Sequence, residues 1–159
     1  MDIRIGHGYD VHALATGESL WLGGIQIEHE KGTVAHSDGD VLIHAICDAM
    51  LGALALGDIG KHFPDTDAAY KNIDSKKLLA ECNALIKKHG FEINNIDSTI
   101  CAQRPKLRPY IDTMRNTLAE ILQLNAGQVS VKATTTEKLG FTGREEGMEA
   151  HAVVLIIKK

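Results

Sequence analysis

Two histidines and one carboxylate have the residue types and spacing of a metal site. Asp10 and His12 are two residues apart, so in an extended segment their side chains point to the same face. His44 follows Asp40 by one helical turn, in an apolar run that is rich in Ala and Leu and is typical of a helix. A two-histidine, one-carboxylate set suits a divalent metal that keeps at least one position open, and an open position indicates ligand chemistry.

The segment 36–44 carries more polar chemistry than the start of a helix requires. We expect a helix over 40–56 with Gly57 as its stop, and one of the two aspartates at 38 and 40 as its cap. A cap does not account for His44. Since this helix is nearly apolar all round, it should be buried, and an ionisable side chain inside it needs a partner.

A second dense polar cluster follows a short alternating strand at 129–133. Its residues, 134–144, include three successive threonines, a glutamate, a lysine, an arginine and two glycines. Hydroxyl and backbone N–H groups suit phosphate oxygens, and Glu137 suits a hard cation, although the spacing is not that of a P-loop. The basic stretch 104–108 could hold a phosphate or a nucleotide, and an exposed basic turn explains it too.

The patterns together predict an α/β fold with α+β character, in which helices cover one face of a single mixed sheet and a small hairpin is added. The strand at 152–157 is expected to be buried on both faces or packed into a subunit interface. The loop 57–67 is either functional or a solvated turn. The predicted order is a strand (3–7), a hairpin around Gly23 and Gly24, a helix (40–56), a helix from Asp74 or Ser75 to Gly90, a strand (91–103), a helix after Pro109 and strands at 129–133 and 152–157.

Length and composition fit one catalytic domain over 1–159, with a net charge of −4 that argues against nucleic acid as a partner. The three cysteines are far apart and form no CxxC, so they are expected to be reduced thiols of a cytosol-like compartment. No signal peptide or membrane span is predicted. We therefore expect a bacterial cytoplasmic protein, or one of an organelle stroma after removal of a transit peptide.

With both clusters in view, the chain resembles the 2-C-methyl-D-erythritol 2,4-cyclodiphosphate synthase family of non-mevalonate isoprenoid biosynthesis. The matching segments are, in order, 4–12, 35–40, 57–60, 63–67 and 132–144. The resemblance implies a homotrimeric lyase with active sites between subunits. It also implies a substrate, 4-diphosphocytidyl-2-C-methyl-D-erythritol 2-phosphate, that is cyclised with release of CMP.

The resemblance also implies roles for individual residues. Asp10, His12 and His44 would hold Zn²⁺, and Glu137 would hold Mg²⁺ or Mn²⁺ on the substrate diphosphate. His36 and Thr135 would lie where the reacting phosphates meet and count as catalytic. The residues implied in substrate binding are Asp10, His12, His36, Ser37, Asp58, Ile59, Gly60, Phe63, Pro64, Asp65, Thr66, Asp67, Ala102, Gln103, Arg104, Pro105, Lys106, Leu107, Arg108, Thr134, Thr135, Thr136, Glu137, Phe141 and Arg144.

Three alternatives stay open at this level. A zinc-dependent hydrolase of phosphoesters or diphosphates would use Asp38 or Asp40 as its base, although no HExxH motif is present. A structural zinc closed by His36 predicts an apo chain that fails to fold. Family members often hold an isoprenoid diphosphate beside the positions of Phe141 and Arg144, but here His151 stands where an acidic residue is usual, so that ligand is uncertain.

Overall fold

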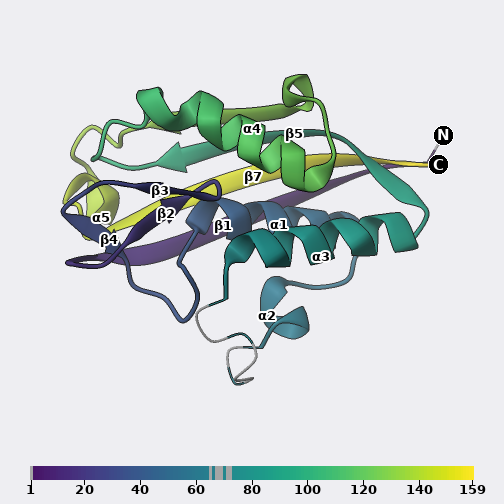
Figure 1. The fold of residues 1–159 in the computed structure, drawn as a ribbon, viewed down its shortest axis with the longest axis horizontal. Helices are drawn as coiled ribbons and strands as arrows, with labels where there is room; N and C mark the ends of the chain where they lie inside the picture. Colours follow the sequence, from purple (N-terminus) through teal and green to yellow (C-terminus); the bar gives the residue numbers. More distant parts are fainter. Residues whose placement is uncertain (1, 65, 67–69, 71–72) are drawn as a thin grey trace.

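The computed structural model describes residues 2–64, 66, 70 and 73–159, and a five-stranded mixed sheet runs through it (Figure 1). The strand order is β4-β1-β7-β5-β6, in which β5 and β6 are parallel and the other neighbours antiparallel. The strands are β1 (Ile3–Thr16), β4 (Lys31–Thr33), β5 (Phe91–Cys101), β6 (Val129–Thr134) and β7 (Gly147–Lys158). The predicted mixed sheet is confirmed.

The predicted hairpin is also confirmed, as a separate two-stranded sheet of β2 (Leu20–Leu22) and β3 (Ile25–Ile27). Its turn residues, Gly23 and Gly24, both have positive φ, at 59° and 80°. A type I′ turn needs this conformation at both central positions, and glycine reaches it without a steric penalty.

Three long helices cover one face of the large sheet (Figure 1). These are α1 (Val41–Ala53), α3 (Ser75–Lys88) and α4 (Ile111–Leu122). Two short helices were not predicted: α2 (Ile59–His62) lies within the expected loop 57–67, and α5 (Gly140–Gly143) lies within the second polar cluster. Single 3-10 turns, η2 (Arg108–Tyr110) and η3 (Ala126–Gln128), precede α4 and β6. In the part of the chain that the structure describes, no helix has the length and apolar character needed to span a membrane.

The N-terminal strand is longer than predicted, and this changes the setting of two candidate ligands. β1 continues past His7 to Thr16, because β7 pairs with it as far as Ala13 and β4 pairs with it from Leu14. Asp10 and His12 therefore lie inside a strand and not in the loop after it. Their side chains still share one face, as their spacing predicts.

The C-terminal strand alternates between a buried and a half-buried side. Met148, Ala150, Ala152, Val154 and Ile156 are buried against the helices, and the residues between them are half-buried on the open face. The expectation that 152–157 is buried on both faces is wrong for the single chain, because the helices cover only one side of the central strand. Its packing against another subunit stays a prediction.

Two glycines of β1 bring helix α1 directly onto the strand. A Cβ at Gly6 would overlap the backbone carbonyl oxygen of Ala49, and one at Gly8 would overlap that of Ala45. The helix therefore touches the strand backbone where any larger residue would hold the two apart. This close approach brings His44, one residue before Ala45, to the neighbouring side chains of β1.

Candidate active site

The three predicted metal ligands meet in a triangle of donor atoms. Asp10 Oδ2 lies 3.0 Å from His12 Nε2 and 3.1 Å from His44 Nδ1, and the two nitrogens are 3.1 Å apart. Ligand distances of about 2.0–2.2 Å around a tetrahedral zinc ion put its donors roughly 3.3 Å apart, so the triangle fits such an ion with little adjustment. The residues come from β1 and α1, as the spacing predicts.

The electrostatics of the triangle favour a bound cation. Burial raises the pKa of Asp10, but hydrogen bonds with His12 and His44 outweigh it and bring the pKa to about 2. Asp10 is therefore an ionised carboxylate at neutral pH, as a metal ligand must be. Burial lowers the pKa of His44, but the hydrogen bond with Asp10 and the charges of Asp10, Asp40 and Asp38 together raise it. The site attracts positive charge, either a proton or a metal ion.

The far side of the His44 ring is held by Ser75, which Asp38 positions, and Ser37 Oγ lies 3.3 Å from the same ring nitrogen. Ser75 Oγ donates its only proton to Asp38 Oδ1, so it can act only as an acceptor for His44 Nε2, 2.9 Å away. The backbone N–H of Ser75 donates to Asp38 Oδ2 at 2.9 Å. In the neutral ring the proton therefore sits on Nε2, and the Nδ1 lone pair faces Asp10 and His12, as metal ligation requires.

Sequence reasoning missed this support. It weighed Ser75 only as a helix cap, but Asp74 caps α3 by accepting the Lys76 N–H, and Ser75 is fully buried against His44. Asp38 was considered as a cap or a base, and Ser75 occupies both of its oxygens. The only signal in the sequence was Ser75 at a helix start, which also fits a cap. Its actual partner, Asp38, lies 37 positions away in the chain, so local patterns do not connect the two.

Asp40 has a structural task. It accepts the N–H of Ile43 as the cap of α1, and it also accepts the N–H groups of Gly23 and Gly24 in the hairpin turn, at 3.0 and 2.7 Å. The side chain is fully buried, and three donors occupy its oxygens. It therefore joins the hairpin to the helix that carries His44 and is not placed to act as the base of a hydrolase.

A cavity of about 690 Å³ opens beside the triangle. Nine predicted site residues line it: Asp10, His12, His36, Ser37, His44, Ile59, Gly60, Phe63 and Thr66. Five others were not predicted: Val34, Ala35, Tyr70, Ile73 and Leu78. Phe63 and Tyr70 meet edge to face, with ring centroids 5.5 Å apart, so one part of the cavity is apolar while the triangle and His36 make another part polar.

Two of the predicted residues that the structure describes near this cavity, Asp58 and Pro64, do not line it. Asp58 caps α2 by accepting the Lys61 N–H at 3.0 Å, and Pro64 is exposed beyond that helix. Asp65 and Asp67 lie outside the described residues. The expected loop 57–67 thus contributes Ile59 and Gly60 of α2, Phe63 and Thr66 to the cavity.

The second polar cluster forms where two parallel strands end together. Cys101 of β5 pairs with Thr134 of β6, and the Ala102 N–H donates to the Thr134 carbonyl at 3.0 Å. Gln103 Oε1 accepts the N–H of Lys138 at 3.1 Å. The basic stretch after β5 and the threonine-rich segment after β6 therefore lie side by side, and such strand ends often carry binding sites in α/β proteins.

Most residues of this cluster are open to solvent, although Thr142 is buried. Glu137 has a φ of 52° and is exposed, and Thr135 Oγ1 donates to its carboxylate at 3.3 Å. Arg144 is paired with Glu146 at 2.9 Å, which lowers the pKa of that carboxyl. None of the described residues in 102–108 or 134–144 lines the 690 Å³ cavity. Within one chain, the two predicted halves of the site therefore do not share a cavity.

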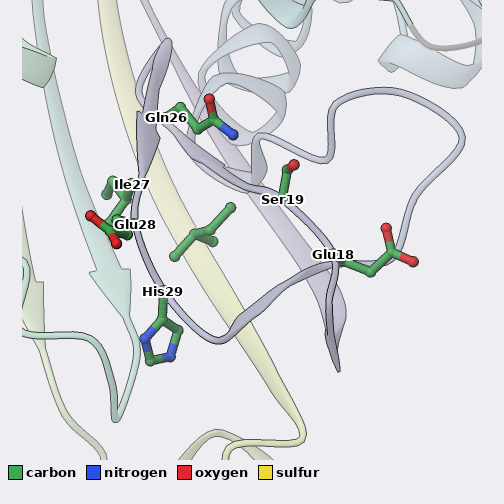
Figure 2. Close-up of a pocket in the computed structure, with 7 residues that line it drawn as sticks. Glu18, Ser19, Gln26, Ile27, Glu28 and His29 are labelled. Atoms are coloured by element: carbon green, nitrogen blue, oxygen red, sulfur yellow. The ribbon is translucent and has the colours of Figure 1, made fainter.

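A further cavity, of about 410 Å³, lies between the hairpin and the segment that precedes it. Figure 2 shows the carboxylates of Glu18 and Glu28 on opposite sides of it, with the His29 ring at one end. Among the described residues, the side chains here do not form a group that could hold a metal. We assign no site to this cavity.

The fold and the triangle together define an α/β protein with a candidate divalent-metal centre between its sheet and the helix packed on it. The YgbB family model matches residues 3–157, and the chain belongs to this family.

Relatives with assigned names agree along nearly the whole chain. A 2-C-methyl-D-erythritol 2,4-cyclodiphosphate synthase of Bacteroides fragilis is 60% identical over 156 residues, which is 98% of each chain. One of Azotobacter vinelandii is 59% identical over 155 residues, 98% of this chain and 99% of that one.

Solved structures agree as well. The bifunctional IspDF of Campylobacter jejuni matches 99% of this chain with a TM-score of 0.95 and 46% identity, and the match spans 43% of that longer protein. The CDP complex of IspF from Plasmodium falciparum has a TM-score of 0.88 and 36% identity, over 99% of this chain and 97% of that one.

Proposed function

We propose that this chain acts as a 2-C-methyl-D-erythritol 2,4-cyclodiphosphate synthase in non-mevalonate isoprenoid biosynthesis. It converts 4-diphosphocytidyl-2-C-methyl-D-erythritol 2-phosphate to the cyclic diphosphate and releases CMP. The observation that carries this proposal is the triangle of Asp10, His12 and His44 at the edge of a cavity, in a chain about 60% identical to synthases of the same length.

The reaction requires positioning more than proton transfer. The 2-phosphate must approach the β-phosphorus of the same molecule, and two anions repel each other unless their charge is neutralised. Zn²⁺ on the triangle and Mg²⁺ or Mn²⁺ at Glu137 would neutralise phosphate charge. A phosphate oxygen is already ionised at neutral pH, which agrees with the engagement of Asp38 and Asp40 in other hydrogen bonds.

The protein side chains supply the orientation. His36 and Ser37 line the cavity beside the triangle, where they can donate to the phosphate that attacks. Phe63 at the apolar part of the cavity suits the methylerythritol end. Holding both ends of one flexible substrate in reacting geometry accounts for much of the barrier lowering in such a reaction.

The nucleotide end belongs to the second polar cluster in this proposal. Thr134, Thr135 and Thr136 and the stretch 102–108 would hold the cytidine diphosphate, and Thr135 would also meet the reacting phosphates. The adjacency of these two segments supports the assignment. A CDP complex of a structural relative that is 36% identical is consistent with a cytidine-linked substrate.

A homotrimer with active sites between subunits completes the proposal. Glu137 does not line the cavity beside the triangle, so in this proposal a neighbouring chain brings the two together. The open face of the sheet also leaves large apolar side chains of β1 uncovered: Ile5 is 67% exposed and Ile3 is 50% exposed. Such a face is typical of a surface that a partner buries. The three free thiols support a reducing compartment, which we take to be the bacterial cytoplasm.

Phosphorus NMR of the protein with substrate, zinc and magnesium tests the function. The proposal predicts CMP and a cyclic diphosphate in equal amounts. CMP with an open-chain product would show that water is the nucleophile and would support the hydrolase alternative. Circular dichroism of the zinc-free chain distinguishes this proposal from the structural-zinc alternative. A structural zinc predicts that the zinc-free chain is unfolded, whereas we expect it to be folded.

A further inference from the structure

A second group of potential metal ligands lies on the open face of the sheet. It consists of Cys101 on β5 and Glu149 and His151 on β7, and their ligand atoms all lie within 4.8 Å of one another. Cys101 and Glu149 are direct partners in the antiparallel ladder, and His151 is two residues further along the same strand. The three side chains therefore project from one face of two adjacent strands.

We propose that Cys101, Glu149 and His151 form a second transition-metal site, distinct from the site of Asp10, His12 and His44. A thiolate, an imidazole and a carboxylate are the protein ligands of Zn²⁺, whereas Mg²⁺ and Ca²⁺ take oxygen ligands only. Three protein ligands leave a fourth position for water or for a group from another subunit. The inference does not depend on the reaction proposed above.

The geometry of the cluster suits an ion after a small movement. Donors of one tetrahedral zinc ion with a sulfur ligand lie roughly 3.5–3.8 Å apart, so these side chains need to close by at most about 1.3 Å. All three are only half-buried, so their rotamers can adjust. Their Cα positions belong to paired central strands and stay fixed while this happens.

A neighbouring tyrosine orients the carboxylate. Tyr9 Oη donates to Glu149 Oε2 at 2.7 Å, and the Tyr9 ring lies 4.9 Å from the His151 ring. Such outer partners fix the direction of a ligand and raise its affinity for metal. One oxygen of Glu149 is engaged in this way, and Oε1 makes no hydrogen bond or ion pair within the described part of the chain.

The charges around the cluster favour a cation over an anion. Within the residues that the structure describes, neither lysine nor arginine forms an ion pair with Glu149, and the nearest ring to His151 besides Tyr9 is His7, at 5.8 Å. Lys132, on strand β6 of the same sheet, forms an ion pair with Asp97 at 2.6 Å. A phosphate or diphosphate at this place would meet the Glu149 carboxylate without a free cation to offset it.

The two metal sites lie on opposite sides of the sheet. Asp10 points toward helix α1, and Tyr9, the residue before it, points to the open face beside Glu149. This separation allows the two sites to be measured independently, because only the second one contains a thiol.

Cobalt titration of the metal-free full-length protein tests the proposal. A cobalt ion bound by Cys101 gives a near-ultraviolet thiolate-to-cobalt charge-transfer band, which the Asp10, His12 and His44 site cannot produce. We expect this band in the wild type and in His44→Ala. We expect it to be lost in Cys101→Ser, and to need at least about 10-fold more cobalt in His151→Ala.

Cys82→Ala is the matched control, because it removes a thiol that is fully buried under the helices and should leave the band unchanged. Absence of the band in the folded wild type at saturating cobalt overturns the proposal. So does a band that survives Cys101→Ser. Circular dichroism of each variant shows that the fold is retained, and the half-buried Cys101 tolerates the change to serine because its side chain does not fill the core.

Discussion

The two faces of strand β1 differ in what they can tolerate and in what they can bind. The face toward helix α1 presents Gly6 and Gly8 and then Asp10 and His12. The other face presents large apolar and aromatic side chains to the outside, among them Ile5 and Tyr9. Because successive side chains of a strand point to opposite faces, β1 contributes to a rigid, polar site on one side and to an uncovered apolar surface on the other.

The difference shows where the precision of the candidate active site comes from. On the helix side, the missing side chains of two glycines fix the distance between strand and helix, and this distance sets the 3.0–3.1 Å triangle. On the open side, the described side chains make a few exposed contacts and no helix packs on them. We expect substitutions on the helix side to have much larger effects.

The largest effect should follow Gly8→Ala. The added methyl group overlaps the backbone carbonyl of Ala45, and a backbone cannot move aside without shifting α1. We expect the free energy of unfolding to fall by about 3 kcal/mol or more, which is the upper end of the range usual for overpacked cores. Metal binding should be lost as well. Urea unfolding measures the first, and zinc retention after dialysis measures the second.

Gly52→Ala is the matched control for that change. Gly52 is an exposed residue within the same helix, and the nearest atom to an added Cβ is 3.9 Å away. Alanine is the better helix former, so this variant should gain up to about 1 kcal/mol. Equal stability of the two variants would contradict the role given to the close approach of α1.

The next largest effect compares neighbouring residues on opposite faces. Asp10→Asn removes the charged ligand of the triangle, so formation of CMP from the substrate should be lost. Tyr9→Phe, one residue earlier, removes only an exposed hydroxyl that donates to Glu149, and CMP formation should be retained. The assay is the release of CMP with zinc and magnesium present. Turnover by Asp10→Asn at the wild-type rate would show that the triangle is not the active site.

A moderate effect is expected from Ser75→Ala. The variant removes the nearer oxygen partner of His44 Nε2 and leaves only Ser37 Oγ, at 3.3 Å, so the Nδ1 lone pair is held less firmly toward the metal. Outer partners of this kind contribute about 10–100-fold to metal affinity. The zinc concentration that gives half-maximal turnover should rise by that factor.

Ser98→Ala provides the comparison for Ser75→Ala. Ser98 is also a buried serine, and its hydroxyl donates to the Ser130 carbonyl on β6, away from the triangle. Its loss should cost about 1 kcal/mol of stability and leave the zinc dependence as it is. If both variants shift the zinc dependence alike, Ser75 acts through stability alone.

The smallest effect concerns a charge pair on the open face. The hydrogen bond from Lys132, 2.6 Å long, holds the pKa of Asp97 below its usual range. The pKa of Asp97 is lower in the folded chain than in the unfolded chain, where it is about 4. The pair therefore stabilises the fold at pH values above the unfolded pKa. This stabilisation is lost as the pH falls through the folded pKa. Both groups are about half exposed, so the contribution is below about 1 kcal/mol.

Urea unfolding of Asp97→Asn at two pH values measures this pair. The variant should be slightly less stable than the wild type at neutral pH and equal to it in acid below the folded pKa. A difference that persists in acid would show that Asp97 stabilises the fold by some other contact.

Local patterns in the sequence predict the parts of this molecule that depend on local physics. The spacing of Asp10 and His12 predicts their shared face, Asp40 predicts the start of α1, and two glycines predict the hairpin. Each depends on a period or a turn within a few residues.

Features that depend on distant pairing could not be predicted in this way. The extension of β1 to Thr16 depends on β7, and the short strand β4 depends on β1. The Asp38 and Ser75 pair joins segments that only the fold brings together. Gly6 and Gly8 belong to a motif that the sequence shows, but their steric reason appears only when α1 is placed on them.

Anomalous diffraction at the zinc edge, from crystals of the zinc-loaded protein, tests the central claim most directly. The account predicts a peak within ligand distance of Asp10 Oδ2, His12 Nε2 and His44 Nδ1, on the helix side of β1. Absence of a peak there in crystals that contain zinc elsewhere would contradict the assignment of the active site to this face.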